Sequence, residues 1–245
     1  MHKPLHPFAA LLLLAAAGPA LAADDPPPQA PAAAAADPYD DVYSAILEGV
    51  DDQATLDRVL DTIMTALQRE VPEMAIVEDA RPGFLGELRT AMRPVMSDYS
   101  ARVMAAYRPK VLKVLGEELT VDEARQVAAF YRSELGRKLL GGAVQHFDLD
   151  ETMRSAVRNP DAPIESDTVN ADFKRIGVQA YLALTPEERK QLDLIASQTP
   201  ALMKLAAAQP RLTALRAEME NEPPTPEENA RLEAVMTAAF AKLED

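Results

Sequence analysis

The chain has 245 residues, a formal net charge of −14, 48% hydrophobic residues, 9 Gly and neither Cys nor Trp. This hydrophobic fraction is sufficient for a folded core, and the acidic balance argues against nucleic acid as a partner. Without Cys the fold cannot use disulfides or the thiolate ligands of structural zinc sites.

Residues 1–22 have the three parts of a secretory signal peptide. Lys3 gives a positive start, an apolar run occupies residues 8–17, and small residues precede a cleavage point after Ala22. The run is too short to cross a hydrocarbon layer of about 30 Å, and no later segment is long and apolar enough. We therefore expect a periplasmic or secreted protein with no transmembrane segment in the mature chain.

Residues 23–38 are rich in Pro and Ala, which is typical of a disordered linker. Helical patterns begin after Asp37, and the clearest amphipathic helix covers residues 51–71, where apolar residues recur at i, i+3, i+4 and i+7. A second strong pattern covers residues 84–107, and we expect Pro94 to kink that helix or split it in two. Further helices are expected from Pro109 to Gly116, within 119–140 on either side of Ser133, and at about 148–158, 168–183, 186–197, 200–218 and 226–243.

No segment alternates apolar and polar residues over the length of a strand. The sequence therefore predicts an all-α fold, an irregular bundle of about nine to ten helices. The loop that follows residue 158 is rich in Pro and Asp and marks a boundary between two helical units, 39–158 and 159–245.

Three of the expected helix starts combine Thr with Glu three residues later, which is the pattern of a capping box. The Thr hydroxyl accepts a backbone N–H of the first turn, while the Glu carboxylate accepts the N–H of the Thr. These acids therefore begin helices and do not indicate an active site. The three pairs are Thr120 with Glu123, Thr185 with Glu188, and Thr225 with Glu228.

Residues 119–140 and 184–205 share more than their capping boxes. Leu119 matches Leu184 at the start, and the pair beginning at Lys138 matches the pair beginning at Lys204 with one residue inserted. We interpret unit 159–245 as a degenerate repeat of the first unit. Chance similarity between two amphipathic helix pairs is the alternative.

The stretch LTVDEARQVAAFYRSELGRKLL carries a Thr-acid helix start, then Phe-Tyr-x-Ser and Gly-x-Lys. With these features it resembles the bacterial domain of unknown function family 2059, although Glu134 stands where the family usually has Pro. The resemblance covers roughly residues 85–145 and implies an exported helical protein with no established activity. The motif residues are Thr120, Glu123, Phe130, Tyr131, Ser133, Gly136 and Lys138.

The motif itself predicts a packed corner between two helices, with a binding groove as the alternative. We expect Phe130 to anchor the core and Tyr131, about a quarter-turn away, to offer its hydroxyl to a partner. Ser133 is placed to end one helix and cap the next, and Gly136 to allow two helices to approach closely.

Residues suited to catalysis or metal binding are scarce. His146 is the single His after residue 22, so a multi-His metal site is excluded, and the ten Met residues show no clustered copper-binding pattern. We therefore expect no catalytic residue, no cofactor and no metal. A carboxylate pair remains an alternative because acids are abundant.

Acidic residues are concentrated before residue 80, whereas basic residues are concentrated between 81 and 140. We interpret these charges as solvated helix faces. The alternatives are that the acidic part docks on the basic part, or that the basic part contacts an anionic partner. The candidate contact residues are Arg89, Arg93, Arg102, Arg108, Lys110 and Lys113.

Together these features predict an exported, non-enzymatic helical interaction or structural module of the bacterial cell envelope. Its partner would be another envelope protein or an anionic envelope component. The alternatives are a periplasmic hydrolase that uses carboxylates in a cleft between the two units, and a peripheral binder of anionic lipid or glycan.

Overall fold

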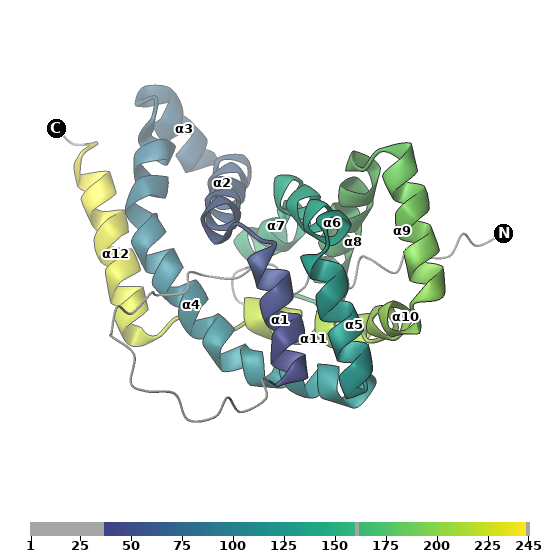
Figure 1. Cartoon of the computed structure of the whole chain (residues 1–245). Coiled ribbons are helices and arrows are strands. Elements are labelled where there is room, and N and C mark those ends of the chain that lie inside the picture. The colour runs from purple at the N-terminus through teal and green to yellow at the C-terminus, as the bar shows by residue number, and fades with distance from the viewer. Residues whose placement is uncertain (1–36, 160–161, 244–245) are drawn as a thin grey trace, which may run out of the picture.

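The computed structural model describes residues 37–159 and 162–243, so the predicted signal peptide and residues 23–36 of the predicted linker lie outside the described residues. The described residues form helices and no strand, which confirms the all-α class, with more helices than the expected nine to ten (Figure 1). The helices are α1 (Pro38–Glu48), α2 (Asp52–Glu70), α3 (Pro72–Ala80), α4 (Phe84–Glu118), α5 (Val121–Arg132), α6 (Glu134–Gln145), α7 (Asp150–Arg158), α8 (Ser166–Ala183), α9 (Pro186–Gln198), α10 (Pro200–Ala207), α11 (Gln209–Glu220) and α12 (Pro226–Ala241).

The three predicted capping boxes are confirmed at the starts of α5, α9 and α12. In α5, the Thr120 hydroxyl accepts the backbone N–H of Glu123 at 3.3 Å, and the Glu123 carboxylate accepts the backbone N–H of Thr120 at 2.9 Å. Because each box satisfies two backbone donors that the helix leaves unpaired, it fixes where the helix begins.

Helix α4 differs from the prediction, because it runs through Pro94 and Pro109 without a break. A split at Pro94 and a separate helix after Pro109 are therefore wrong, whereas the alternative of a bend agrees with the curve of the helix in Figure 1. A proline inside a helix costs about 3 kcal/mol. Burial of apolar side chains at both ends of α4 offsets that cost and keeps the two halves in one helix.

The single helix expected at 200–218 is also wrong, because the chain forms α10 and α11 with a break at Ala208. Pro210 lies at the second position of α11, where its missing N–H is not needed. The same residue inside one long helix would lack a hydrogen bond and would clash with the preceding turn. Proline therefore ends one helix here, whereas α4 tolerates it.

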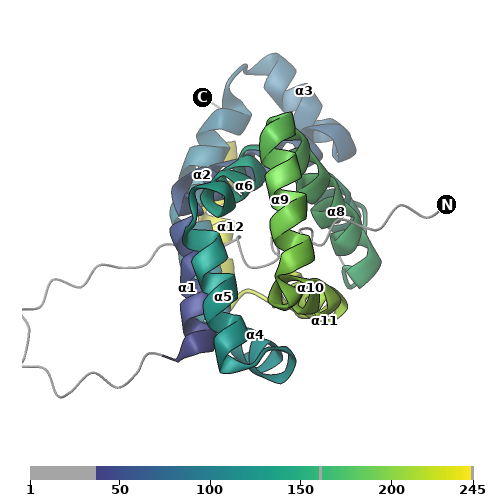
Figure 2. The ribbon, with the colours of Figure 1, turned by 45° about the vertical axis from the view of Figure 1, so that its right-hand side comes forward.

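Two large hydrophobic clusters form most of the interior of the described residues, and α4 contributes to both; a further small cluster, Val103, Tyr107 and Met219, lies at the middle of α4. The larger cluster combines α1, the last turns of α4, α5, α6 and the helices α8 to α11, so it draws on both predicted units. The smaller cluster combines α2, α3, the first turns of α4 and α12, with Phe84 and Phe240 at a ring distance of 5.3 Å. Figure 1 shows α12 antiparallel to α4, and Figure 2 shows α10 and α11 below α9.

The corner between α5 and α6 has the predicted construction. The Ser133 hydroxyl donates to the Phe130 carbonyl at 2.6 Å and accepts the backbone N–H of Gly136 at 3.1 Å, so Ser133 ends α5 and caps α6. A Cβ atom on Gly136 would lie 2.1 Å from the Phe130 carbonyl oxygen and 2.8 Å from Tyr131 Cα. Glycine is therefore required for the two helix ends to come this close.

We expect Gly136→Ala to lower the free energy of unfolding by about 2 kcal/mol or more, because backbone atoms would have to move to make room. Gly141→Ala is the matched control in the same helix, since a Cβ there has no atom within 4 Å. Alanine also favours helix over glycine, so the control should be neutral or stabilised. Urea unfolding of both variants measures the difference, and equal midpoints would contradict the close contact at Gly136.

Candidate functional site

The motif residues Phe130 and Tyr131 both point into the protein, with ring centroids 5.0 Å apart in an edge-to-face arrangement. Phe130 anchors the core as predicted. The expectation that Tyr131 offers its hydroxyl to a partner is wrong, because the side chain is completely buried in the larger cluster and burial raises its pKa well above the ordinary value. Helix α1 packs against α5 and covers this face. The motif thus builds a helix corner.

Lys138, the last motif residue, forms an ion pair with Glu188, the capping-box acid of α9. In return, Lys204 in α10 lies 2.6 Å from Glu123, the capping-box acid of α5. The two similar segments therefore exchange ion pairs, each lysine binding the helix start of the other segment. Each acid already accepts a backbone N–H, so these contacts connect one helix start to a neighbouring helix pair.

The guanidinium groups of Arg89 and Arg93 face the acidic first part of the chain. Arg89 lies 2.9 Å from Asp57 and 2.5 Å from Asp61, and Arg93 lies 3.2 Å from Asp57. Both arginines come from α4 and both acids from α2. These contacts are the ones expected if the acidic first part of the chain docks on its basic central part, which was one of the alternatives for the uneven charge.

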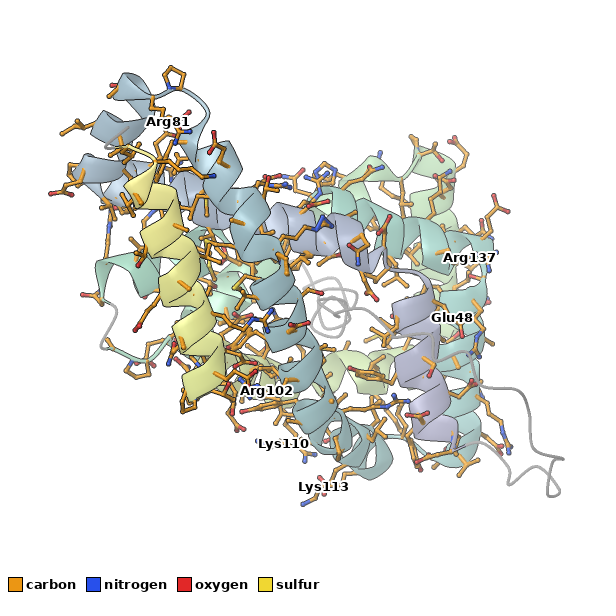
Figure 3. All side chains as sticks on the ribbon, turned by 90° about the vertical axis from the view of Figure 1, so that its left-hand side faces the viewer. Glu48, Arg81, Arg102, Lys110, Lys113 and Arg137 are labelled. Carbon is orange, nitrogen blue, oxygen red and sulfur yellow. The ribbon has the colours of Figure 1, made fainter. Side chains whose placement is uncertain are left out.

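The other basic candidates on α4 also have acidic neighbours. Arg102 contacts Glu228 and Glu222, Arg108 contacts Asp40, Lys110 contacts Glu218 and Lys113 contacts Glu117. Figure 3 shows Arg102 beside the beginning of α12 and the two lysines at the far end of α4. Lys113 is the most exposed of these side chains, at 74%, and its contact is 3.9 Å long.

A cavity of about 270 Å³ lies beside the middle of α4, between the two hydrophobic clusters. Residues from α2, α4, α7, α11 and α12 line it together with Ile164 and Pro224, and most of the lining is apolar. The apolar lining residues are Leu56, Val59, Ile63, Val95, Met96, Met153, Ala156, Ile164, Pro224 and Leu232.

One wall of the cavity carries a buried ion pair within α11. Arg216 is only 7% exposed, and its Nε donates to Glu220 Oε1 at 2.6 Å. The guanidinium carbon lies 5.6 Å from the ring centroid of Phe173, which belongs to the larger cluster. The charge of Arg216 is thus balanced by one carboxylate and one aromatic face.

The third charged residue of the lining, Glu228, is bound by Arg102 in a bidentate arrangement. Arg102 Nε and Nη2 donate to the two oxygens of Glu228, each at 2.9 Å. The hydrogen bond from Arg102 lowers the pKa of Glu228, with a further contribution from the backbone N–H of Thr225. Glu228 is therefore held ionised although it is 7% exposed.

The carboxylate and phenol groups of the lining are already hydrogen-bonded within the chain, which leaves them little capacity to act on a reacting molecule. Both oxygens of Glu228 accept hydrogen bonds from the chain, and the Tyr99 hydroxyl donates to the Glu222 carbonyl at 2.7 Å. His146 lies at the exposed end of α6, away from the lining. Within residues 37–159 and 162–243, no three His, Asp or Glu side chains are grouped so that they could bind a metal ion.

The sequence did not single out Arg216 or Glu220. A signal is present, since Arg216 follows Leu212 by four residues and so continues the apolar face of α11 with a charge. A lone arginine on an apolar face needs a buried counter-ion, and Glu220 one turn later supplies it. Which helices would face that arginine cannot be read from the local pattern.

Comparison with known proteins agrees with the motif. Residues 106–143 match the family model described as "Uncharacterized protein conserved in bacteria (DUF2059)". The family resemblance is therefore confirmed over this segment. It spans the last turns of α4, all of α5 and most of α6. No curated protein and no solved structure is significantly similar to the chain.

Among the helices of the described residues, including the long α4, none combines the length and the apolar composition that crossing a membrane requires.

The exchanged ion pairs predict how stability depends on pH. The Lys204 and Lys138 contacts, together with the backbone N–H groups of Thr120 and Thr185, lower the pKa values of Glu123 and Glu188 from 4.5 to about 2. These acids therefore contribute to stability fully above pH 4.5, and the contribution is lost as the pH falls from there toward 2.

We expect Lys204→Gln to raise the pKa of Glu123 and so reduce the loss of stability on acidification. Lys113→Gln is the control, because Lys113 makes a long and highly exposed contact. Urea unfolding at a series of pH values measures the slope. An unchanged slope in Lys204→Gln would show that this ion pair does not form in solution.

Proposed function

We propose that the chain is an exported, non-enzymatic helical binding module of the bacterial cell envelope, and that the cavity beside α4 is its binding site. The observation that carries the proposal is a mostly apolar lining in which each charged side chain is paired with an opposite charge. Apolar cavities with a few fixed polar groups are typical of small-molecule sites. Export is supported by the signal-peptide features of residues 1–22.

The same pairing favours binding over the hydrolase alternative. A hydrolase with two carboxylates needs one of them protonated near neutral pH, and burial or a nearby negative charge must raise its pKa. The pKa of Glu228 is shifted in the opposite direction, because Arg102 lowers it and donates hydrogen bonds to both carboxylate oxygens. Glu220 is bound to Arg216. Neither carboxylate is arranged as a general acid.

The ion pairs along α4 also favour the cavity over the basic segment as the contact site. An anionic lipid or glycan would have to compete with carboxylates that Arg89, Arg93 and Arg102 already contact at 3.2 Å or less. The carboxylates already in contact with these arginines are held in place by their helices, whereas an incoming anion would lose translational and rotational freedom on binding. This supports an internal site.

We further propose that the pair α5–α6 and the pair α9–α10 arose by duplication. Some corresponding residues share their burial, such as Leu119 and Leu184, both 3% exposed, and Val127 and Leu192, both fully buried, although buried Ala128 corresponds to exposed Asp193. The exchanged ion pairs described above relate the two pairs symmetrically. Chance similarity would not require either feature.

The binding proposal is tested with the small, uncharged apolar fluorophore 1-naphthylamine, whose size suits a cavity of about 270 Å³. We expect saturable binding, and we expect Ala156→Leu to weaken it by about tenfold, or 1.4 kcal/mol, because the added side chain fills the cavity. Ala129→Leu, at an exposed position of α5, is the matched control and should bind normally. Absence of saturable binding, or equal affinity in both variants, would contradict the assigned site.

The hydrolase alternative has its own test. We expect the purified protein to show no turnover with chromogenic ester, phosphoester and glycoside substrates. Turnover that disappears in Glu228→Gln, a variant that keeps the size of the side chain, would replace the binding proposal with the hydrolase.

A further inference from the structure

The cavity wall formed by Arg216 and Glu220 has one unused donor group and one unused acceptor. Both contacts between the two side chains, from Nε and from Nη2, end on the same oxygen, Oε1. Among the described residues, Glu220 Oε2 has no hydrogen-bond donor and Arg216 Nη1 has no acceptor. A guanidinium has five N–H donors and a carboxylate about four acceptor sites, so the pair retains capacity for a ligand.

The charges around the cavity cancel in pairs. Arg216 is balanced by Glu220, and Glu228 is balanced by Arg102. A ligand that brought a net charge into this apolar space would lose its hydration without gaining an unpaired counter-ion, which is strongly unfavourable. An uncharged molecule does not meet this penalty.

From these two observations we infer that the cavity binds an uncharged apolar molecule with one head group that both donates and accepts a hydrogen bond, such as a hydroxyl or a carboxamide. The head group accepts from Arg216 Nη1 and donates to Glu220 Oε2. The apolar body contacts the α2 and α4 walls at residues such as Leu56, Val95 and Met96. This inference rests on the proposed binding function and specifies its ligand class.

The size of the cavity limits the ligand. A volume of 270 Å³ is on the scale of about ten non-hydrogen atoms, at roughly 30 Å³ for each water-sized group. A linear molecule such as decan-1-ol is therefore a suitable probe. Larger lipids would have to leave part of their chain outside.

Titration calorimetry with four probes of similar length tests the ligand class. The probes are decan-1-ol, decanoate, decylammonium and nonyl methyl ether, which lacks an O–H to donate. We expect decan-1-ol to bind at least about tenfold more tightly than each of the other three, because it is uncharged and pairs with both groups. Equal or tighter binding of either ion, or of the ether, would overturn the inference while leaving the binding function intact.

The variant Glu220→Gln tests the role of the ion pair directly. It removes the counter-charge of Arg216, so the preference should shift from decan-1-ol toward decanoate by about tenfold or more. Glu218→Gln is the control, because Glu218 lies on the same helix and pairs with Lys110 at the surface. An unchanged preference in a folded Glu220→Gln protein would overturn the assignment of the head group. If no probe binds the unaltered protein, the proposed function itself is contradicted.

Discussion

The fold depends on the continuity of α4. This one helix places Phe84 and Leu88 in the smaller hydrophobic cluster and Val111 and Leu115 in the larger one. Helix α2 adds a second connection, because it packs on α7 and its Val59 packs against the larger cluster. Packing at both ends therefore determines the conformation in the middle, where local preference alone would predict a break.

The cavity follows from this arrangement. The middle of α4 lies between the two large clusters, and the helices that cover it on either side belong to different clusters. The covering helices α11 and α12 bring Arg216, Glu220 and Glu228 into the lining. Paired charges at such a junction cost stability compared with apolar packing. The proposed ligand would give these paired charges a role beside a mostly apolar lining.

Local chemistry made some features predictable and others not. The capping boxes and the corner at Ser133 and Gly136 depend on hydrogen bonds within a few residues, so the sequence predicted them correctly. The burial of Tyr131 depends on α1, which is remote in sequence, and the prediction of an outward hydroxyl failed for that reason. The cavity wall at Arg216 could not be predicted either, because residues from five helices define it.

The central claim, that the space beside the middle of α4 holds a ligand, is tested most directly by methyl-labelled methionine NMR. Met96 and Met153 line the cavity, whereas Met74 lies in the smaller cluster and Met203 is exposed. On addition of decan-1-ol, the account predicts saturable shifts of the Met96 and Met153 methyl signals, with those of Met74 and Met203 unchanged. Shifts confined to Met74 or Met203, or no saturable shift at all, would contradict it.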